Sequence, residues 1–389
     1  MAGKRASRQQ TSGSGQSSSD ASPSEPALIT GVNLEEPLRI LVVGGGTGLS
    51  SLLAGLKYYA RPELRREPNP DAFPLPPEVR AEITAVVTVT DDGGSSGRLR
   101  REFDVLPPGD IRNCMVALSE DATLLSRLFQ YRFANGKGLK GHSFGNLFLA
   151  VLTQLTGDFA HAIKVSSEVL AIAGKIYPST ASKVELRARL TNGREVKGET
   201  NISKSRVPIE RVFIHPKHVQ PLPETLDAIA KADLICLGPG SLFTSVIPNL
   251  LVDGVPEAIR RSTAVKAYFC NLMWQPGETM HFRASDHVQA IHDHARGSLV
   301  DCVIVNTAAV GDDLQTRYAA QKARPVDVDA DRLIDMGMRL VEGELLAETD
   351  RVRHHPERAA ALAIRMALMA RKMQQRANVL RPATAKAGS

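Results

Sequence analysis

The chain has 389 residues, of which 43% are hydrophobic, 23% charged and only 5% aromatic. A chain of this length can bury a large core and exceeds one minimal domain, so we expect either a large α/β domain with appendages or two domains. No apolar run reaches the roughly 18 to 20 residues of a membrane span, and no hydrophobic block follows the basic residues near the N-terminus. We therefore expect a cytoplasmic protein that is not an integral membrane protein. The four cysteines form no CxxC pair, which favours reduced thiols over disulfides or structural zinc.

The net charge of +6 is unevenly distributed. From Arg351 to the C-terminus, nine Lys and Arg residues face a single acid, Glu357, so this segment carries +8 and the rest of the chain −2. A near-neutral body argues against a nucleic-acid partner. The basic segment fits a tail that meets an acidic partner, and it fits equally a solvated helix end with no specific role.

The first predicted elements follow a polar tail. Residues 1–37 are rich in Ser, Gly, Gln and Pro, so we expect them to be disordered. Residues 38–43 form an apolar run typical of a buried parallel strand. Leucines at i, i+3, i+4 and i+7 then predict an amphipathic helix: Leu49, Leu52, Leu53 and Leu56. A Pro-rich insertion leads to a second strand at 83–89.

The later elements extend the alternation of strands and helices. Residues 184–200 predict a hairpin around an Asn-Gly turn. Three further buried strands are predicted at 234–238, 265–270 and 301–306. We therefore expect a Rossmann-like α/β fold over residues 38–355, a doubly wound and mostly parallel sheet with an antiparallel hairpin excursion. A basic C-terminal helix and tail are expected over 356–389.

A glycine-rich turn follows the first strand and consists of Gly44, Gly45, Gly46, Thr47 and Gly48. Glycines at such a turn let backbone N–H groups approach an anion at the positive end of the helix dipole, so we interpret it as a phosphate-binding loop. The alternative is a turn that only packs the helix against its strand. The turn lacks the third glycine of the dinucleotide fingerprint, and the chain has no P-loop motif, which disfavours a P-loop kinase or ATPase.

Other loops place polar residues at the same edge of the predicted sheet. Asp91 and Asp92 end the second strand, where two carboxylates suit a divalent metal or sugar hydroxyls, or simply cap a turn. A loop that opens a helix contains Asn146, and the loop after strand 234–238 contains Gly238, Gly240 and Ser241. If the strands are parallel, these loops converge on one crevice.

The sequence shows no metal motif among its histidines. His287, His292 and His294 share a predicted helix opened by Ser285, but no two are four residues apart, so we expect surface or capping histidines. Asp110 is predicted to cap another helix. The chain has no GxSxG elbow, and no sequence neighbour would activate Cys114, so no catalytic nucleophile is identified.

Seven long motifs occur in order along the chain: LVVGGGTGLSSLLAGLK, ITAVVTVTDDGGSSGRLR, LPPGDIRN, GHSFGNL, LGPGSLFTSVIPNLLV, CNLMWQPGET and SDHVQAI. Together they resemble the YvcK family, also called the gluconeogenesis factor family, from about Leu38 to about Ala370. That family is similar to CofD, the phospholactate transferase, so the resemblance implies a CofD-like fold. It also implies a cytoplasmic protein that binds UDP-sugars, notably UDP-N-acetylglucosamine, and is required for cell shape and envelope synthesis during gluconeogenic growth.

The resemblance also assigns ligand contacts. It places the nucleotide diphosphate on the glycine loop with Thr47, and it adds Asn249, Tyr318 and Arg353 as further contacts. An arginine suits a diphosphate, and a tyrosine can stack on uracil or cover a sugar.

The CofD part of the resemblance assigns Asp91 or Asp92 to metal and phosphate and Asn271 to the substrate cleft. Trp274 departs from the family, which commonly has a polar residue at this position.

Two hypotheses remain open. In the first, the protein is a non-catalytic UDP-sugar sensor that requires no cofactor and acts on envelope-synthesis protein partners. In the second, it is a CofD-like Mg²⁺-dependent transferase of a phosphorus-containing group, with Asp91 or Asp92 as metal ligands. A homodimer is expected by analogy with the transferase.

Overall fold

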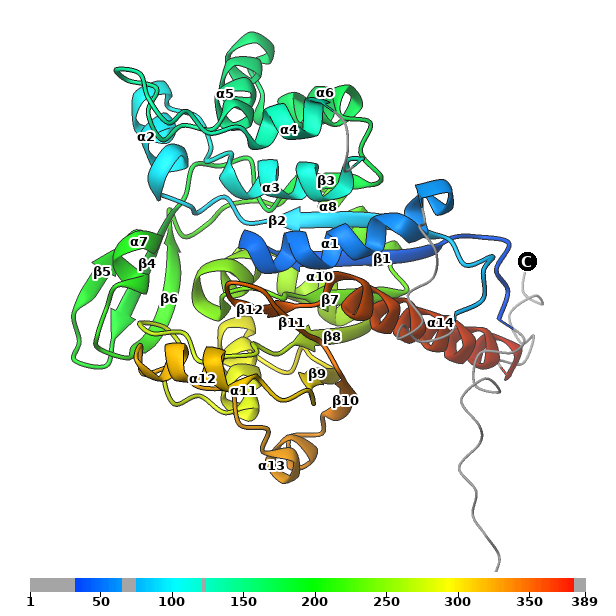
Figure 1. Cartoon of the computed structure of the whole chain (residues 1–389). Helices are drawn as coiled ribbons and strands as arrows, with labels where there is room; N and C mark the ends of the chain where they lie inside the picture. Colours follow the sequence, from blue (N-terminus) through cyan, green and yellow to red (C-terminus); the bar gives the residue numbers. More distant parts are fainter. Residues whose placement is uncertain (1–31, 65–74, 121–123, 381–389) are drawn as a thin grey trace, which may run out of the picture.

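Seven parallel strands form the central sheet of the computed structural model, which describes residues 32–64, 75–120 and 124–380. The order across the sheet is β10-β9-β8-β7-β1-β2-β3 (Figure 1). Their bounds are β1 (Leu38–Gly44), β2 (Ala81–Val87), β3 (Lys175–Pro178), β7 (Leu234–Leu237), β8 (Val265–Phe269), β9 (Cys302–Asn306) and β10 (Arg339–Gly343). The chain runs from β1 outward to β3 and then resumes at β7 on the other side of β1. The strand order therefore reverses between β1 and β7, which is where open α/β sheets form ligand clefts.

The predicted Rossmann-like sheet is confirmed. Its central strands could be predicted from the sequence because they are buried and therefore apolar. Every residue of β7 is buried, and Arg39 is the only partly exposed residue of β1, as expected for strands covered on both faces. The edge strands β3 and β10 were not predicted. Both are less apolar, and β3 ends in a proline, which suits an edge.

Helices cover both faces of the sheet (Figure 1). On one face α1 (Gly46–Ala60) packs between α3 (Gly109–Leu118) and α14 (Pro356–Leu380); on the other face lie α8 (Pro223–Lys231) and α10 (Val255–Arg261). The four predicted leucines of α1 are fully buried, which confirms its amphipathic face. A helical group lies between β2 and β3 in the sequence: α2 (Gly94–Phe103), α4 (Leu124–Gln130), α5 (Phe144–Thr156) and α6 (Phe159–Val169). The remaining helices are η2 (Pro62–Leu64), α7 (Glu199–Ser203), η3 (Leu242–Val246), α9 (Ile247–Leu250), α11 (Ala284–Ala295), α12 (Asp312–Ala319) and α13 (Ala330–Asp335).

Two small antiparallel sheets flank the central one. The predicted hairpin is present as β4 (Glu185–Leu190) and β5 (Glu195–Lys197), with Gly193 at φ 79° in its turn. A third strand, β6 (Ile209–His215), extends it on the other side of β4 and was not predicted. A second hairpin, β11 (Leu346–Glu348) with β12 (Val352–His354), was also not predicted, because strands of three residues carry no periodicity.

Two predicted helix caps are wrong. The residue before α3 is Pro108, and Asp110 lies inside the first turn, where its carboxylate accepts a hydrogen bond from the N–H of Gly46. In α11, the helix begins at Ala284, and Ser285 is its second residue. Ser285 donates instead to Asp329, because the loop before α13 packs over this helix end.

The expectation of surface or capping histidines is wrong for His287 and His294, which are buried because α11 packs into the core. Burial lowers the pKa of His287 to about 4 and also lowers the pKa of His294. Their Nδ1 atoms pair with the carbonyls of Arg283 and Ala290. These histidines are therefore neutral packing residues.

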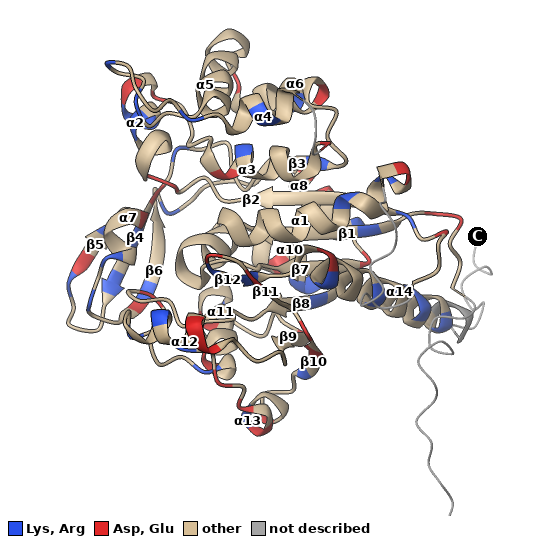
Figure 2. Ribbon diagram, viewed as in Figure 1, with Lys and Arg blue, Asp and Glu red and all other residues tan. Residues whose placement is uncertain are grey.

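The C-terminal helix α14 packs into the same core as the sheet, although the sequence suggested a boundary at residue 356. Its apolar face contacts α1 so closely that a Cβ on Gly55 would lie 2.1 Å from the Pro356 carbonyl oxygen. Basic residues occur along the helix (Figure 2). One of them, Arg371, is buried: it pairs with Asp233 at 2.6 Å and donates to the carbonyls of Glu36 and Pro37.

No single helix within residues 32–64, 75–120 and 124–380 has both the length and the apolarity to cross a bilayer. By length and composition alone, one pair of helices bent by 78° passes the same test, Leu242–Leu250 with Val255–Arg261.

We predict that Arg371→Ala lowers the free energy of unfolding by about 3–5 kcal/mol, because the carboxylate of Asp233 would stay buried without its partner. Arg376→Ala is the matched control, since Arg376 is exposed on the same helix. Urea denaturation measures both. Equal midpoints for the two variants would contradict a structural role for the ion pair.

Candidate functional site

A cleft of about 450 Å³ opens at the carboxyl ends of β1 and β7, where the strand order reverses. Nine predicted site residues line it: Gly45, Gly46, Thr47, Gly48, Gly240, Ser241, Asn271, Tyr318 and Arg353. Further lining residues were not predicted, among them Ser51, Ser203, Ser245, Gln275, Glu278 and His354. Of the loops predicted to converge, those after β1 and β7 line the cleft, whereas Asp91, Asp92 and Asn146 are not among its lining residues. The loop after β8, which contains Asn271, completes it.

The glycine loop presents the N-terminus of α1 to the cleft. Gly46 adopts φ 68°, a left-handed conformation that favours glycine, and the helix begins there without a side-chain cap or an acid in its first turn. The first N–H groups of a helix have no partners within the helix and carry the positive end of its dipole. Thr47 follows directly. This geometry fits an anion such as phosphate.

Gly48 allows two loops to pack closely. The loop therefore has a packing role at Gly48, in addition to the geometry at Gly46 that fits a phosphate. A Cβ on Gly48 would lie 2.7 Å from the carbonyl oxygen of Pro239, which belongs to the loop after β7. Gly44, the last residue of β1, and Gly238, the first residue after β7, do not line the cleft; a Cβ on Gly44 would lie 3.7 Å from the Cα of Gly238. The loops after β1 and β7 thus touch through their backbones.

Asn249 lies beneath this loop rather than in the cleft. It is fully buried, and its Nδ2 donates to the carbonyls of Ser245 (2.8 Å) and Gly44 (3.3 Å). Its side chain therefore ties the end of β1 to the segment after β7. Any effect of Asn249 on a ligand would pass through the shape of the loop.

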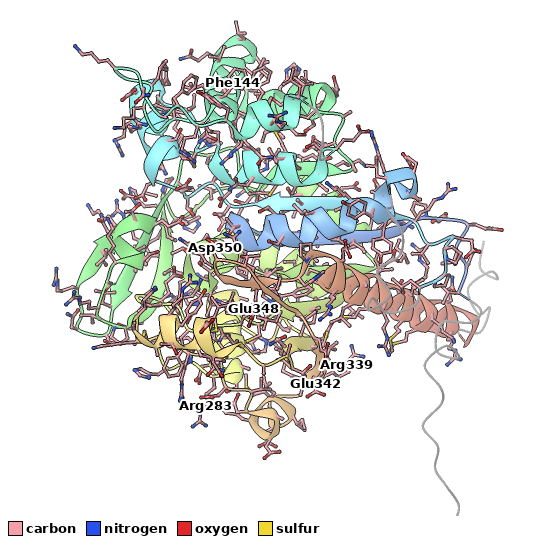
Figure 3. All side chains as sticks on the ribbon, viewed as in Figure 1. Phe144, Arg283, Arg339, Glu342, Glu348 and Asp350 are labelled. Atoms are coloured by element: carbon pink, nitrogen blue, oxygen red, sulfur yellow. The ribbon has the colours of Figure 1, made fainter. Side chains whose placement is uncertain are left out.

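Asn146 is also outside the cleft. It is buried in the first turn of α5, where its N–H donates to the Ser143 side chain at 3.2 Å. Figure 3 shows its neighbour Phe144 within the helical group, away from Asp350 in the turn of the β11–β12 hairpin. The structure does not bring Asn146 to the residues of the glycine loop.

One wall of the cleft is a hydrogen-bond chain that joins the loops after β7 and β8. The side chain of Asn271 donates to Gln275 at 2.8 Å, and Gln275 donates to Ser241 at 2.9 Å. Trp274 lies beside them and is fixed by its Nε1–H bond to the Phe282 carbonyl. The guanidinium of Arg324 stacks 4.2 Å from the Trp274 ring centre.

The opposite wall comes from the β11–β12 hairpin and α12. The hydroxyl of Tyr318 accepts a hydrogen bond from the N–H of Val352 at 3.1 Å, which fixes β12 against α12. Arg353 follows Val352 and lines the cleft. Tyr318 and Arg353 are thus both at the cleft as predicted, and the backbone of Val352 engages the tyrosine hydroxyl.

A buried acidic cluster adjoins the glycine loop. It consists of Asp91, Asp110, Glu199 and Glu278, and sequence reasoning assigned only Asp91 to a site. Burial raises the pKa of Asp110 to about 7, with the charge of Asp91 as the second cause. Burial also raises the pKa values of Asp91, Glu199 and Glu278. The other three were missed because they come from α3, α7 and the segment after β8, which only the fold brings together.

Asp92, next to the cluster, and Glu278, within it, make different contacts. Asp92 accepts from the N–H (2.9 Å) and hydroxyl (2.7 Å) of Thr200, so it holds α7 in place. Glu278 lines the cleft: its Oε1 accepts from Ser203 and Thr244, both at 3.1 Å, while its Oε2 has no partner among the described residues. The Glu278 carboxyl therefore lies beside the cleft with its Oε2 shielded from solvent.

Metal binding has a limited basis in the described part of the chain. There, no group of three or more His, Cys, Asp or Glu side chains is arranged to hold a metal ion. Mg²⁺, however, commonly uses one or two carboxylates and completes its shell with waters and substrate phosphates. Asp91 and Asp110 fit that role chemically, since Asp110 lies beside the glycine loop.

The parallel sheet, the glycine loops at its reversal point and the cleft between them define a Rossmann-like α/β protein of the CofD type. The sequence matches the family described as 2-phospho-L-lactate transferase CofD over residues 40–346. It is 49% identical over 317 residues to the gluconeogenesis factor of Halalkalibacterium halodurans, which covers 82% of this chain and 92% of that protein. It is 44% identical over 327 residues to the gluconeogenesis factor of Bacillus subtilis, covering 84% and 97%. A crystal structure of a UPF0052 family member from Bacillus halodurans superposes with a TM-score of 0.77 at 47% identity, covering 85% of this chain and 99% of that one. The chain therefore belongs to the CofD family and, within it, to the gluconeogenesis factors, the YvcK family.

We predict that the wild type loses stability relative to Asp110→Asn in metal-free buffer as pH rises from about 4 to about 7. Asp110 has a pKa of about 7 when folded against 3.8 as its ordinary value, so the folded state binds its proton more tightly between these values. Its contribution is thus lost as pH rises through the folded pKa. Urea midpoints across this range measure the slope, and identical slopes in both proteins would contradict the burial of this carboxyl.

Proposed function

We propose that this protein binds a UDP-sugar, with UDP-N-acetylglucosamine as the first candidate, and acts as a sensor that does not convert it. The observation that carries the proposal is the N-terminus of α1 at the strand reversal, which faces a cleft that Arg353 lines as well. Its N-cap residue Gly45 has no capping side chain, and the Asp110 carboxylate accepts the N–H of Gly46. Backbone N–H groups and an arginine both favour phosphate oxygens. A diphosphate is the ligand group that uses both.

The polarity of the cleft supports a ligand with a neutral, hydroxyl-rich part. Neutral polar side chains line the cleft: Ser203, Ser241, Ser245, Asn271 and Gln275. Their hydroxyl and amide groups can exchange hydrogen bonds with the hydroxyl and amide groups of a sugar. The ring of Tyr318 would cover the uracil or the sugar.

The sensor role rests on the chemistry of the titratable groups. His354 lines the cleft, but burial lowers its pKa to about 4, so it is neutral and a weak base at neutral pH. The relatives carry the name gluconeogenesis factor. On that basis we propose a cytoplasmic protein, acting as a homodimer on envelope-synthesis partners, that supports cell shape during gluconeogenic growth.

The acidic cluster favours a second candidate, a Mg²⁺-dependent transferase of a phosphorus-containing group like the one for which the CofD family is named. Bound Mg²⁺ would neutralise negative charge on a phosphoryl donor. Asp91 and Asp110 would hold it, while Asp92 remains bonded to Thr200. The N–H groups of the glycine loop would orient the donor.

We predict saturable calorimetric binding of UDP-N-acetylglucosamine, with NAD, GTP and free UDP as comparisons. Thr47→Ala and Arg353→Ala should each weaken binding by about tenfold or more, because each removes a diphosphate contact. Arg351→Ala is the matched control, since Arg351 is exposed in the same hairpin and does not line the cleft. At a hundredfold excess over Kd the ligand should add about 2.7 kcal/mol of stability. Normal affinity in the Thr47 and Arg353 variants would refute the assignment.

Turnover distinguishes the two candidates. With Mg²⁺ and phospholactyl-type or UDP-sugar donors, the sensor predicts no product by mass spectrometry. The transferase predicts product that Asp110→Asn and Asp91→Asn abolish and EDTA removes. Product formation that these variants retain would contradict the metal role of the cluster, and any product would overturn the sensor.

A further inference from the structure

A second concave surface, separate from the cleft, runs along the edge strand β6. This basic groove has a volume of about 910 Å³ and shares no lining residue with the cleft. Its walls come from β4, β5 and β6, from the segment that joins α9 to α10, and from the C-terminal end of α11. Figure 2 shows basic positions on the strands of this small sheet.

The lining of the groove is predominantly cationic. Six Lys and Arg residues face three acids: Arg187, Arg189, Arg211, Lys217, Arg261 and Arg296 against Glu195, Asp253 and Glu257. Arg187 pairs with Glu185 and Arg189 with Glu195, while Asp253 pairs with His218. Within the described residues the other four cations form no ion pair, and all four are exposed. The surface therefore has positive charge that the protein does not neutralise itself.

The strand register concentrates this charge on one face. Residues Leu186, Ala188 and Val212 point into the core, so the alternate positions of β4 and β6 point outward. Arg189 stands directly opposite Arg211, and Arg187 stands opposite Lys197 of β5. Like charges at opposed positions destabilise a sheet. Glu185 and Glu195 offset this for Arg187 and Arg189, whereas Arg211 forms no ion pair within the described residues.

The shape of the groove fits an extended chain. Five consecutive residues of β6, 211–215, line it, a length of about 16 Å at the usual rise of a strand. Partly buried apolar surface from Phe213 and Leu251 lies between the cations. The N–H of Val212 is already bonded to Nε2 of His294 at 3.0 Å, so an occupant would bind through its side chains at this position rather than by pairing with the strand.

We propose that the basic groove docks an acidic peptide segment of a partner protein, with carboxylates on Arg211 and Arg296 and apolar side chains on Phe213. The mixture of cations and apolar surface matches a peptide that alternates both kinds of side chain. Apart from histidines, Phe213 is the one aromatic residue lining the groove, whereas binding of single-stranded nucleic acid relies on several stacked rings. This inference does not depend on the UDP-sugar.

The test uses the full-length protein and a short fluorescein-labelled peptide of alternating glutamate and leucine, followed by anisotropy. Arg211→Glu and Arg296→Glu should each weaken binding by about tenfold, and raised salt should weaken it further. Lys164→Glu makes the same charge change on exposed α6 and should leave binding intact. All three variants should keep the affinity of the wild type for UDP-N-acetylglucosamine, whatever that affinity is, which separates this result from the proposed function.

Three outcomes would overturn the proposal. The first is absence of saturable binding of the acidic peptide by the wild type. The second is equal loss in the Lys164 variant, which would mean attraction to net charge alone. The third is tighter binding of a single-stranded oligonucleotide that the same groove substitutions abolish, which would make the groove a nucleic-acid site.

Discussion

The close approach of two backbones at the strand reversal is the constraint on which the site depends. β1 and β7 are neighbours in the sheet although nearly two hundred residues separate them; β1 ends at Gly44, and Gly238 directly follows β7. The carbonyl of Pro239 touches the first turn of α1 at Gly48, where a Cβ would lie 2.7 Å from the Pro239 oxygen. Side chains at this junction would push the two loops apart. The N-terminal residues of α1 would then no longer line the cleft as they do here.

The electrostatics of the cleft follow from what surrounds that junction. The N-terminus of α1 supplies positive potential, and Asp110 accepts one of its N–H groups from below. Burial among other carboxyls raises the pKa of Asp110, so part of the cluster is protonated near neutral pH. Arg353 lies on the wall formed by the β11–β12 hairpin and α12, while neutral amide and hydroxyl groups form the wall of Asn271, Gln275 and Ser241. A ligand with one anionic and one hydroxyl-rich end matches this arrangement.

The sequence and the structure agree most closely where burial is complete. The sequence predicted strands at 38–43 and 234–238 correctly, because strands covered on both faces consist almost entirely of apolar residues. The turn before α1 could be predicted from its glycines, because the positive φ of Gly46 and the close packing at Gly48 both favour glycine. Short elements such as β12 could not be predicted, because three residues carry no periodic signal. Nevertheless, β12 contains Arg353, which lines the cleft. His287 and His294 were wrongly expected at the surface, because the spacing of histidines in the sequence does not show which face of α11 is buried.

The sequence by itself determined the fold class, the glycine loop and, together with the resemblance to the family, nine of the residues that line the cleft. These depend on local steric rules and on motifs that stay contiguous in the chain. The tertiary structure alone decided that Asn249 supports the loop from beneath, that Asp91 rather than Asp92 faces Asp110, and that Glu278 lies beside the cleft. It also placed Arg371 in a buried ion pair rather than on a free basic tail. The physical reason is that burial, pKa and hydrogen-bond partners depend on residues distant in the chain, which only the packed fold brings into contact.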